Sequence, residues 1–450
     1  WNFFTIGFGA IIGTGWVLQV GDWMVVGGGP VPAMIAFLLG AIFLVPVGAV
    51  FGELTAAIPI SGGIVEYVDR SFGRTLSYIT GWLLALGNGI LCPWEAIAIS
   101  TLVSEMFGSL PGLEWLRAVK LYTILGADVY LFPTLIALGF AVYVIFLNFR
   151  GASSAAKLQA FLTKALLCGM LLAMGVSLFT GSPEHAMPVF SQVTGAGGGK
   201  PATEGTSLFA GIVSVLVLTP FFYAGFDTIP QQAEEAAEGL NWNKFVKIIS
   251  LALLAAGGFY MVCIYSFGTI LDWHEFVKSP VPALACLKGI ATLGPMGPMN
   301  SFYGATSRIM LAMGRKGQLP EKFAEVDPKS GAPKLACAVL GVITVIGPFL
   351  GKNMLIPLTN VSALAFIFSC GMVALACLRM RFTEPDLPRP YEVPGGKFGI
   401  GLAIAACAII IGLLVIPFSP ASLNMVEWSI VIGWLAVGLA LMAFTNSRKK

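Results

Sequence analysis

The sequence predicts an all-α integral membrane protein of about twelve transmembrane helices. Of its 450 residues, 57% are hydrophobic and only 11% are charged, whereas a water-soluble domain carries about 25% charged residues. Many of the apolar residues form runs of roughly 20, the length that a helix needs to cross a bilayer. A single soluble core could not bury so much apolar surface. We therefore expect a lipid bilayer to surround the chain.

Twelve apolar runs qualify as spans, and polar, charged or Gly/Pro-rich stretches separate them. The runs are residues 3–20, 31–57, 77–106, 131–148, 160–181, 208–231, 249–271, 290–313, 335–350, 354–378, 399–417 and 427–445. The eighth is the weakest, because Gly294 to Pro298 read Gly-Pro-Met-Gly-Pro, a poor helical sequence. Either that helix is broken there, or residues are missing from the sequence.

Lysine and arginine predict the orientation, because cytoplasmic connections carry an excess of them. With the N-terminus inside, the inward connections hold eighteen of the 26 lysines and arginines and the outward loops hold six, while Lys164 and Arg308 lie within spans. We therefore expect a multi-pass protein of the cell membrane (the inner or plasma membrane) with both termini cytoplasmic.

Composition also excludes several classes of function. The net charge of +3 is small and the basic residues are not clustered, so no nucleic-acid partner is expected. The eight cysteines lack metal-ligand spacing, and the only histidines, His185 and His274, fall in predicted loops. We expect no metal, no cofactor and no nucleophile–base pair, and hence no enzyme.

Two spans are interrupted in the same way. The first contains Gly9 to Gly15, read as Gly-Ala-Ile-Ile-Gly-Thr-Gly, and the sixth contains Pro220 to Pro230. Because they are five spans apart, they cross the membrane in opposite directions. This layout predicts an inverted five-helix repeat with broken helices 1 and 6 at the membrane midplane.

Broken helices expose backbone N–H and C=O groups that lipid cannot satisfy. Half-helix N-termini favour a carboxylate, and freed carbonyls favour an ammonium group, so a zwitterionic amino acid satisfies both. The alternative is that the glycines only allow close helix packing. A dinucleotide-binding loop is excluded because no strand precedes the glycines.

Several motifs together resemble the amino acid–polyamine–organocation transporter superfamily over nearly the whole chain. They are Gly9 to Gly15, Phe221 to Asp227 followed by Ala233-Glu234-Glu235, Glu53 to Gly63, Asn148 to Gly151, Thr306 to Arg308 and Met313 to Arg315. The resemblance implies a secondary active transporter, a permease that moves an amino acid across the membrane by alternating access. The alternatives are a polyamine or amine transporter and an amino acid exchanger without ion coupling, and a sensor that shares the fold also remains open.

The resemblance also implies the residues that bind the substrate. Thr14 and Gly15 would bind its carboxylate through a hydroxyl and a backbone N–H. The carbonyls of Ile11, Phe221 and Ala224 would accept hydrogen bonds from the α-ammonium, and Phe221 would be the aromatic lid over the substrate.

Further residues are assigned more loosely. By the same resemblance, Asn88 on the third span and Ser362 on the tenth would line the side-chain pocket. Asp227 follows the break in the sixth span, where its carboxylate could cap freed N–H groups or approach a substrate amine. Glu95 is a second acid within a span, and two acids beside one cavity would favour amines or cationic amino acids.

Proton-coupled members of the family carry a lysine on the fifth span in place of a sodium ion. Here Lys164 lies five residues after Gln159, although the family spacing is about seven, and Leu166 occupies that place. Coupling to protons through Lys164 is one prediction. Sodium held by Thr306 or Ser307 and exchange without ion coupling are the others, and a snorkelling Lys164 would need no coupling role.

These inferences give a chain of three parts. Residues 1–181 would form the first five-helix repeat, 208–379 the inverted second repeat, and 399–446 helices 11 and 12. The expected partners are a small-molecule amino acid or amine, the lipid bilayer and a proton as coupling ion.

Overall fold

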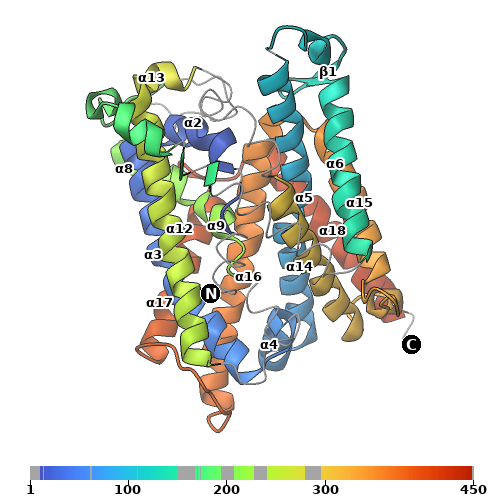
Figure 1. Cartoon of the computed structure of the whole chain (residues 1–450). Helices are drawn as coiled ribbons and strands as arrows, with labels where there is room; N and C mark the ends of the chain where they lie inside the picture. Colours follow the sequence, from blue (N-terminus) through green and yellow to red (C-terminus); the bar gives the residue numbers. More distant parts are fainter. Residues whose placement is uncertain are drawn as a thin grey trace.

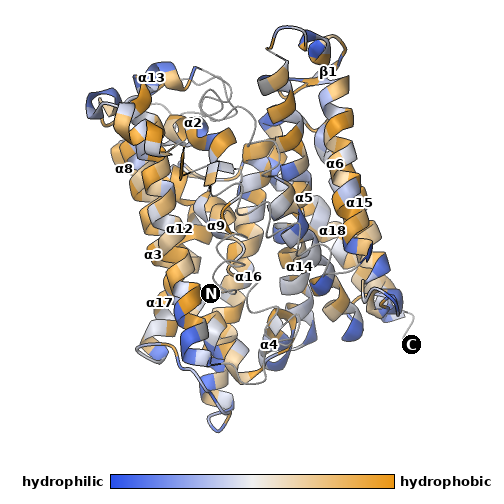
Figure 2. Ribbon diagram, viewed as in Figure 1, coloured by the Kyte–Doolittle hydropathy of each residue, from blue (hydrophilic) through white to orange (hydrophobic). Residues whose placement is uncertain are grey.

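The computed structural model describes residues 11–13, 15–60, 63–108, 110–150, 168–169, 171–172, 174–193, 207–227, 241–278 and 295–447. These residues form a bundle of long, nearly parallel helices (Figure 1). Hydrophobic residues make up most of the long helices, and hydrophilic residues are concentrated toward the two ends of the bundle (Figure 2).

Seven described helices are long and apolar enough to cross a membrane. They correspond to predicted spans 2, 3, 4, 7, 10, 11 and 12, whose positions are thereby confirmed. The helices are α3 (Pro30–Ala57), α5 (Arg74–Phe107), α6 (Leu131–Arg150), α12 (Trp242–Ile270), α16 (Leu355–Thr383), α17 (Lys397–Val415) and α18 (Met425–Ser447).

Five shorter helices occupy parts of the other predicted spans. They are α2 (Gly15–Gly27), α8 (Leu208–Leu216), α9 (Thr219–Tyr223), α14 (Met296–Arg315) and α15 (Lys334–Ile346). Helix α2 runs past residue 20, where the first span was expected to end. In the fifth predicted span, 160–181, residues 160–167, 170 and 173 lie outside the described residues, and 174–180 are helical. The total of twelve helices and the inverted repeat therefore stay predictions.

The structure describes the proline-rich stretch of the eighth predicted span from Pro295 onward. Met296, Gly297 and Pro298 are helical, and Pro295 precedes the first turn with helical backbone angles. Proline is tolerated in a first turn because the N–H that it lacks would have no intrahelical partner there. Among the described residues, the proline-rich sequence forms the first turn of this helix.

The described residues are mostly helical, as the sequence predicts, and they include one non-helical element that it did not predict. Two antiparallel strands, β1 (Lys120–Ile124) and β2 (Ala127–Tyr130), form a hairpin between α5 and α6. The sequence analysis also missed the short helix α4 (Gly63–Phe72). Single-turn elements complete the connections: η1 (Glu114–Arg117), η2 (Pro183–Ala186), α13 (Trp273–Phe276), η5 (Glu321–Ala324), η6 (Gly347–Phe349) and η7 (Lys352–Met354).

The helices pack as two groups (Figure 1). In the first group, α3 packs along α12 and α8, and α2 packs against α8 and α3. In the second group, α5 is central and packs against α14, α16, α6 and α15, while α4 packs against α5 and α16. The hairpin and α13 lie at one end of the bundle, and α4 and the C-terminus lie at the other.

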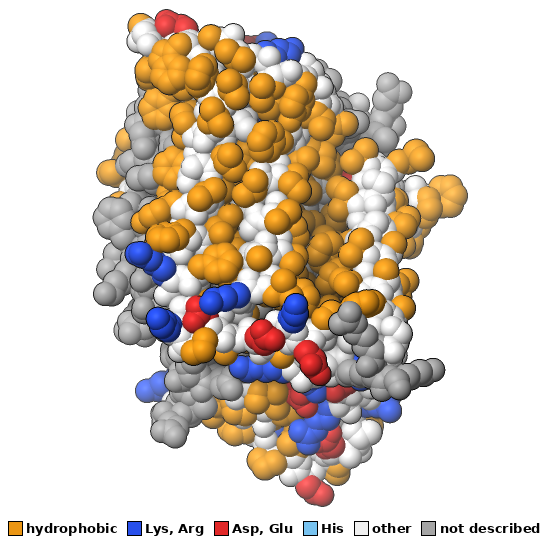
Figure 3. Space-filling model, turned by 90° about the vertical axis from the view of Figure 1, so that its right-hand side faces the viewer, with side chains coloured by type: hydrophobic (Ala, Val, Ile, Leu, Met, Phe, Trp, Pro, Cys, Tyr) orange, Lys and Arg blue, Asp and Glu red, His pale blue; other side chains and the backbone are white. Residues whose placement is uncertain are grey.

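One lateral face of the molecule is a broad apolar surface. Figure 3 shows hydrophobic side chains over most of this face, with lysines, arginines and acidic residues gathered toward one end. Exposed apolar side chains on α18, such as Ile432 and Leu439, are 60% and 53% exposed. Apolar surface of this extent is expected where lipid is the solvent.

Candidate functional site

The break in the sixth predicted span lies between α8 and residue 227. Helix α8 ends at Leu216, and α9 adds only the turn Thr219–Tyr223. The backbone then leaves the helix at Ala224, and Gly225 has a φ of 120°, a conformation that favours glycine. The described part of the sixth predicted span therefore leaves the helix after Tyr223.

The carboxylate of Asp227 satisfies part of this broken backbone. Its Oδ1 accepts a hydrogen bond from the Gly225 N–H at 3.1 Å, and its Oδ2 accepts one from Asn88 Nδ2 at 3.1 Å. Because an unpaired N–H is costly in a bilayer, Asp227 stabilises the break and attaches it to α5.

Gly13, which precedes α2, and Gly15, its first residue, each permit a close approach to a neighbouring segment. A Cβ atom on Gly15 would lie 2.7 Å from Cε1 of Phe222, and one on Gly13 would lie 2.8 Å from Cγ of Pro298. Larger residues at either position would displace their neighbours. Close packing is thus one reason for glycine at both positions.

A small buried cavity of about 20 Å³ lies where the two breaks meet. The first helix group and its breaks contribute Ile11, Gly13, Gly15, Phe221, Phe222, Ala224 and Tyr260, and the second group contributes Leu91, Trp94, Glu95, Pro298 and Phe302. A volume of this size holds about one water molecule. An amino acid fits only when the walls move apart.

Five residues of the predicted site meet at this cavity, namely Ile11, Gly15, Phe221, Ala224 and Glu95. Thr14 and Lys164 lie outside the described residues. Three others are placed elsewhere: Asn88 and Asp227 bond to one another, and Ser362 Oγ donates to the Gly87 carbonyl at 2.7 Å and so joins α16 to α5. None of these three lines the cavity as it stands.

Glu95 brings a carboxylate to the edge of the first break. Its side chain is 3% exposed, and its Oε1 would lie 3.2 Å from a Cβ atom on Gly13. A carboxyl group therefore lies beside the backbone at Gly13.

Tyr260 was missed by sequence reasoning, although it contacts both breaks. Its hydroxyl lies 3.4 Å from the Ile11 carbonyl oxygen and 3.2 Å from that of Phe222. A phenol has one proton to donate, so the two carbonyls share a single donor. A substrate ammonium could replace it at Ile11, which is one of the carbonyls predicted to bind that group.

Aromatic rings close the cavity on one side. The rings of Phe221 and Trp94 are 5.3 Å apart, and those of Phe221 and Phe222 are 5.0 Å apart. Trp94 is held by hydrogen bonds from its indole N–H to the Leu355 carbonyl and Thr359 Oγ1, both at 3.1 Å. Phe221 therefore packs against a fixed partner across the two helix groups.

A larger hollow of about 260 Å³ lies near the β hairpin. Its charged lining is largely paired, with Arg117 2.8 Å from Glu105 and Lys120 2.7 Å from Asp128. It contains none of the predicted site residues. Among the described residues, no cluster of three or more His, Cys, Asp or Glu side chains could hold a metal ion.

The sequence is similar to known amino acid permeases. A family model described as amino acid permease matches residues 1–441. The chain is 26% identical to the branched-chain amino acid permease BcaP of Bacillus subtilis (strain 168), over 99% of this chain and 91% of that protein. It is 26% identical to the aspartate-proton symporter of the same organism, over 87% of this chain and 74% of that protein.

A plant protein is similarly related. The cationic amino acid transporter 2, vacuolar, of Arabidopsis thaliana is 27% identical over 85% of this chain and 59% of that protein. Because the permease family model spans almost the entire sequence, the chain belongs to the amino acid permease family and is a transporter of the amino acid–polyamine–organocation superfamily.

Proposed function

We propose that this protein is a secondary active transporter that moves an amino acid across the membrane by alternating access. The observation that carries the proposal is the meeting of two broken segments, Ile11 to Gly15 and Phe221 to Ala224, at one buried cavity between two groups of helices. A site placed between two packed groups opens to one side or the other when the groups move.

Backbone chemistry supports an amino acid as the substrate. In the proposed bound state, the carbonyls of Ile11, Phe221 and Ala224 accept hydrogen bonds from the ammonium group. The Gly15 N–H and the Thr14 hydroxyl bind the carboxylate, and Phe221 closes over the substrate. Gly15 is the first residue of α2, so its N–H is one of those without an intrahelical partner.

Uptake by the purified protein in liposomes tests this function. Proteoliposomes should accumulate at least one member of a mixture of twenty tritiated amino acids above the level of protein-free liposomes. A Gly15→Leu variant that still purifies as a folded protein should not, because its side chain would collide with Phe222. Equal uptake by protein-free and protein-containing liposomes would exclude transport of these substrates.

We further propose that the transport is coupled to protons. Lys164 belongs to an apolar stretch of the sequence, and a low-dielectric surrounding disfavours the charged form of a lysine. In this proposal Lys164 gains and loses a proton in each cycle. An inward proton gradient should drive accumulation without sodium, and Lys164→Ala should abolish accumulation while substrate binding remains measurable. Equal accumulation by both proteins would leave Lys164 without a coupling role, and absence of gradient-driven accumulation in the wild type would favour sodium coupling or exchange.

Glu95 supports a second candidate substrate class, polyamines or cationic amino acids. Its carboxylate lines the cavity beside the first break, and a cationic side chain there would gain a charge-assisted hydrogen bond. Competition by arginine and putrescine in the uptake assay distinguishes this class from neutral amino acids.

We propose that the end of the bundle carrying α4 and the C-terminus faces the cytoplasm of a cell with this protein in its cell membrane. Arg70, Arg74, Lys316 and Lys322 lie in α4, η5 and the segments beside them, and such positive residues favour the cytoplasmic side. In intact cells, an impermeant thiol reagent should label a cysteine placed at His274 and not one placed at Asp386. The reverse result would invert the topology.

The division into two inverted repeats, residues 1–181 and 208–379, with 399–446 as an addition, belongs to the same proposal. It is supported by the positions of the two breaks, which come from the first and sixth predicted spans and face one cavity.

A further inference from the structure

Glu53 carries a buried carboxylate near the end of α3, remote from the residues that line the cavity. Its side chain is 1% exposed. A carboxylate so deeply buried is unfavourable unless positive groups and hydrogen-bond donors surround it. The side chain therefore needs partners from neighbouring elements.

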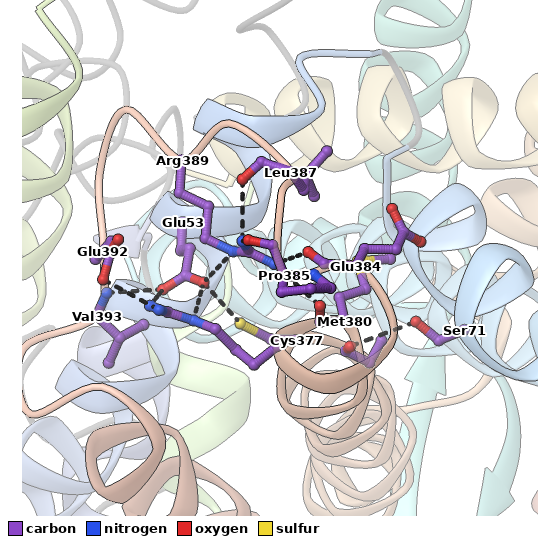
Figure 4. Close-up of polar contacts among 12 residues, drawn as sticks. Glu53, Ser71, Cys377, Met380, Glu384, Pro385, Leu387, Arg389, Glu392 and Val393 are labelled. Carbon is purple, nitrogen blue, oxygen red and sulfur yellow. Dashed lines mark hydrogen bonds and ion pairs between the residues drawn. The ribbon is translucent and has the colours of Figure 1, made fainter.

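Those partners come from α16 and from the segment that follows it (Figure 4). Arg381 forms a bidentate salt bridge with Glu53, in which Nε lies 2.9 Å from Oε1 and Nη2 lies 2.7 Å from Oε2. The Val393 N–H donates to Oε2 at 2.8 Å, and Nε of Arg389 lies 3.4 Å from Oε1. We name these four residues the Glu53 clasp.

Arg389 makes the segment after α16 rigid. Its side chain is 7% exposed, and its Nη2 donates to the carbonyls of Met380 at 3.0 Å and Glu384 at 2.9 Å. The Met380 carbonyl also accepts from the Glu384 N–H, and the Glu384 carbonyl also accepts from the Leu387 N–H, so the guanidinium adds to the hydrogen bonds that end α16. The clasp thus joins α3 to a segment that is itself fastened to the end of α16.

The clasp connects the two groups of helices. Glu53 belongs to α3 of the first group, and Arg381 belongs to α16, which packs against α5 of the second. Other ion pairs at this end differ, since Lys316 is 2.5 Å from Glu66 and 2.6 Å from Asp69 and so joins α4 to the end of α14 within the second group. A path from the cavity to this end must separate α3 from α16, but it can leave the Lys316 pairs intact.

We propose that Glu53 is a gating residue for transport: the Glu53 clasp closes the α4 end of the molecule and breaks each time that end opens. This inference rests on the proposed alternating-access function. Glu53 acts on the substrate only through the positions of α3 and α16. The bidentate contact of Arg381 with Glu53 favours one closed arrangement of α3 and α16. When the helices part, water can replace these hydrogen bonds on both side chains.

The native Cys377 reports on the clasp. Its Sγ lies 3.6 Å from Glu53 Oε1, and the residue is 1% exposed. In a protein whose other cysteines are replaced, a soluble maleimide should modify Cys377 slowly. Glu53→Gln should raise that rate by about tenfold or more, a usual size for coupling between two conformations, and Glu53→Asp should restore part of the protection. Glu66→Gln is the matched control and should leave the rate near that of the parent protein.

A covalent bridge provides the second measurement. Joining Cys377 to a cysteine placed at Glu53 with a short bis-methanethiosulfonate reagent should stop uptake of the mixture of tritiated amino acids, and a reductant should restore it. Equal maleimide rates for Glu53→Gln and the parent, equal increases for Glu53→Gln and Glu66→Gln, or full uptake by the bridged protein would each overturn the gating role. Absence of uptake in the parent would instead refute the transport proposal, while the maleimide rates would still report on the clasp.

Discussion

Asn88 Nδ2 donates a hydrogen bond of 3.1 Å to Asp227 Oδ2, and this bond joins α5 to the break in the sixth predicted span. Both residues are fully buried, and Asn88 Oδ1 has no hydrogen-bond partner among the described residues. The second carboxylate oxygen of Asp227 accepts from the Gly225 N–H. This pair therefore supports the shape of the broken segment, one turn away from the cavity.

The pair predicts different outcomes for two substitutions of Asp227. Asp227→Ala leaves the Gly225 N–H and the Asn88 amide without this acceptor, which should lower the free energy of unfolding by about 1–3 kcal/mol for each group. Asp227→Asn should cost less, because the Asn88 amide can turn over and present its unused Oδ1 to the new N–H₂ group. Thermal unfolding of the detergent-purified proteins measures the difference, and equal losses of stability would contradict it.

Phe221 should contribute to substrate affinity through its aromatic ring. Phe221→Ala removes the contact with Trp94 and should weaken transport at least about tenfold, or about 1.4 kcal/mol. Phe221→Tyr and Phe221→Trp should keep part of the activity. The matched control is Phe276→Ala, because Phe276 is equally buried at 4% exposure but belongs to α13. Unchanged uptake by a folded Phe221→Ala protein would remove Phe221 from the site.

Lys316 gives a prediction about stability and pH. Burial lowers its pKa, but hydrogen bonds to Asp69 and Glu66 and their charges outweigh that effect, so the pKa is raised above the ordinary 10.5. A raised pKa means that the folded protein holds the proton more tightly than the unfolded chain. The stabilisation is therefore fully present below about pH 10.5 and is lost as the pH rises through the folded pKa.

This effect is isolated by comparing the melting temperatures of the wild type and Lys316→Met from pH 8 to pH 11.5. The wild type should melt at the higher temperature at pH 8, and the gap should narrow above about pH 10.5. The effect should be modest, because the lysine side chain is 26% exposed. A gap that stays constant over the whole range would show that the ammonium charge does not supply it.

Apolar periodicity predicted most of the long helices but not the polar elements between them. Helix α3 begins and ends within one residue of its predicted span, because a continuous apolar run has only one stable form in lipid. Helix α4 was missed because Glu66, Asp69 and Arg70 make it polar, and it lies at the end of the bundle. The hairpin was missed because its strands are short and mostly exposed, so no alternation of buried residues marks them.

The sequence predicted which backbone segments form the candidate site, but not all of the side chains that line it. Glycines marked the two breaks, and those segments do meet at the cavity. Helices α5 and α16 are apolar around much of their circumference, so sequence alone could not tell which face is turned to the cavity. Ser362 was predicted to line the pocket, but its hydroxyl bonds to the Gly87 carbonyl. Trp94 and Tyr260 line the cavity, and only their aromatic character marked them in the sequence.

Glu95 should determine whether the protein accepts positively charged substrates. The carboxylate lines the cavity, is 3% exposed and lies beside Gly13. A hydrogen bond to a charged group contributes about 1.5–3 kcal/mol, so Glu95→Gln should weaken competition by arginine or putrescine at least about tenfold. Competition by leucine should change much less, because its α-ammonium binds to backbone carbonyls. Glu105→Gln is the control on the same helix, since Glu105 is paired with Arg117 near the hairpin. If arginine and putrescine do not compete in the wild type, or if Glu95→Gln weakens arginine and leucine equally, the carboxylate does not select for charge.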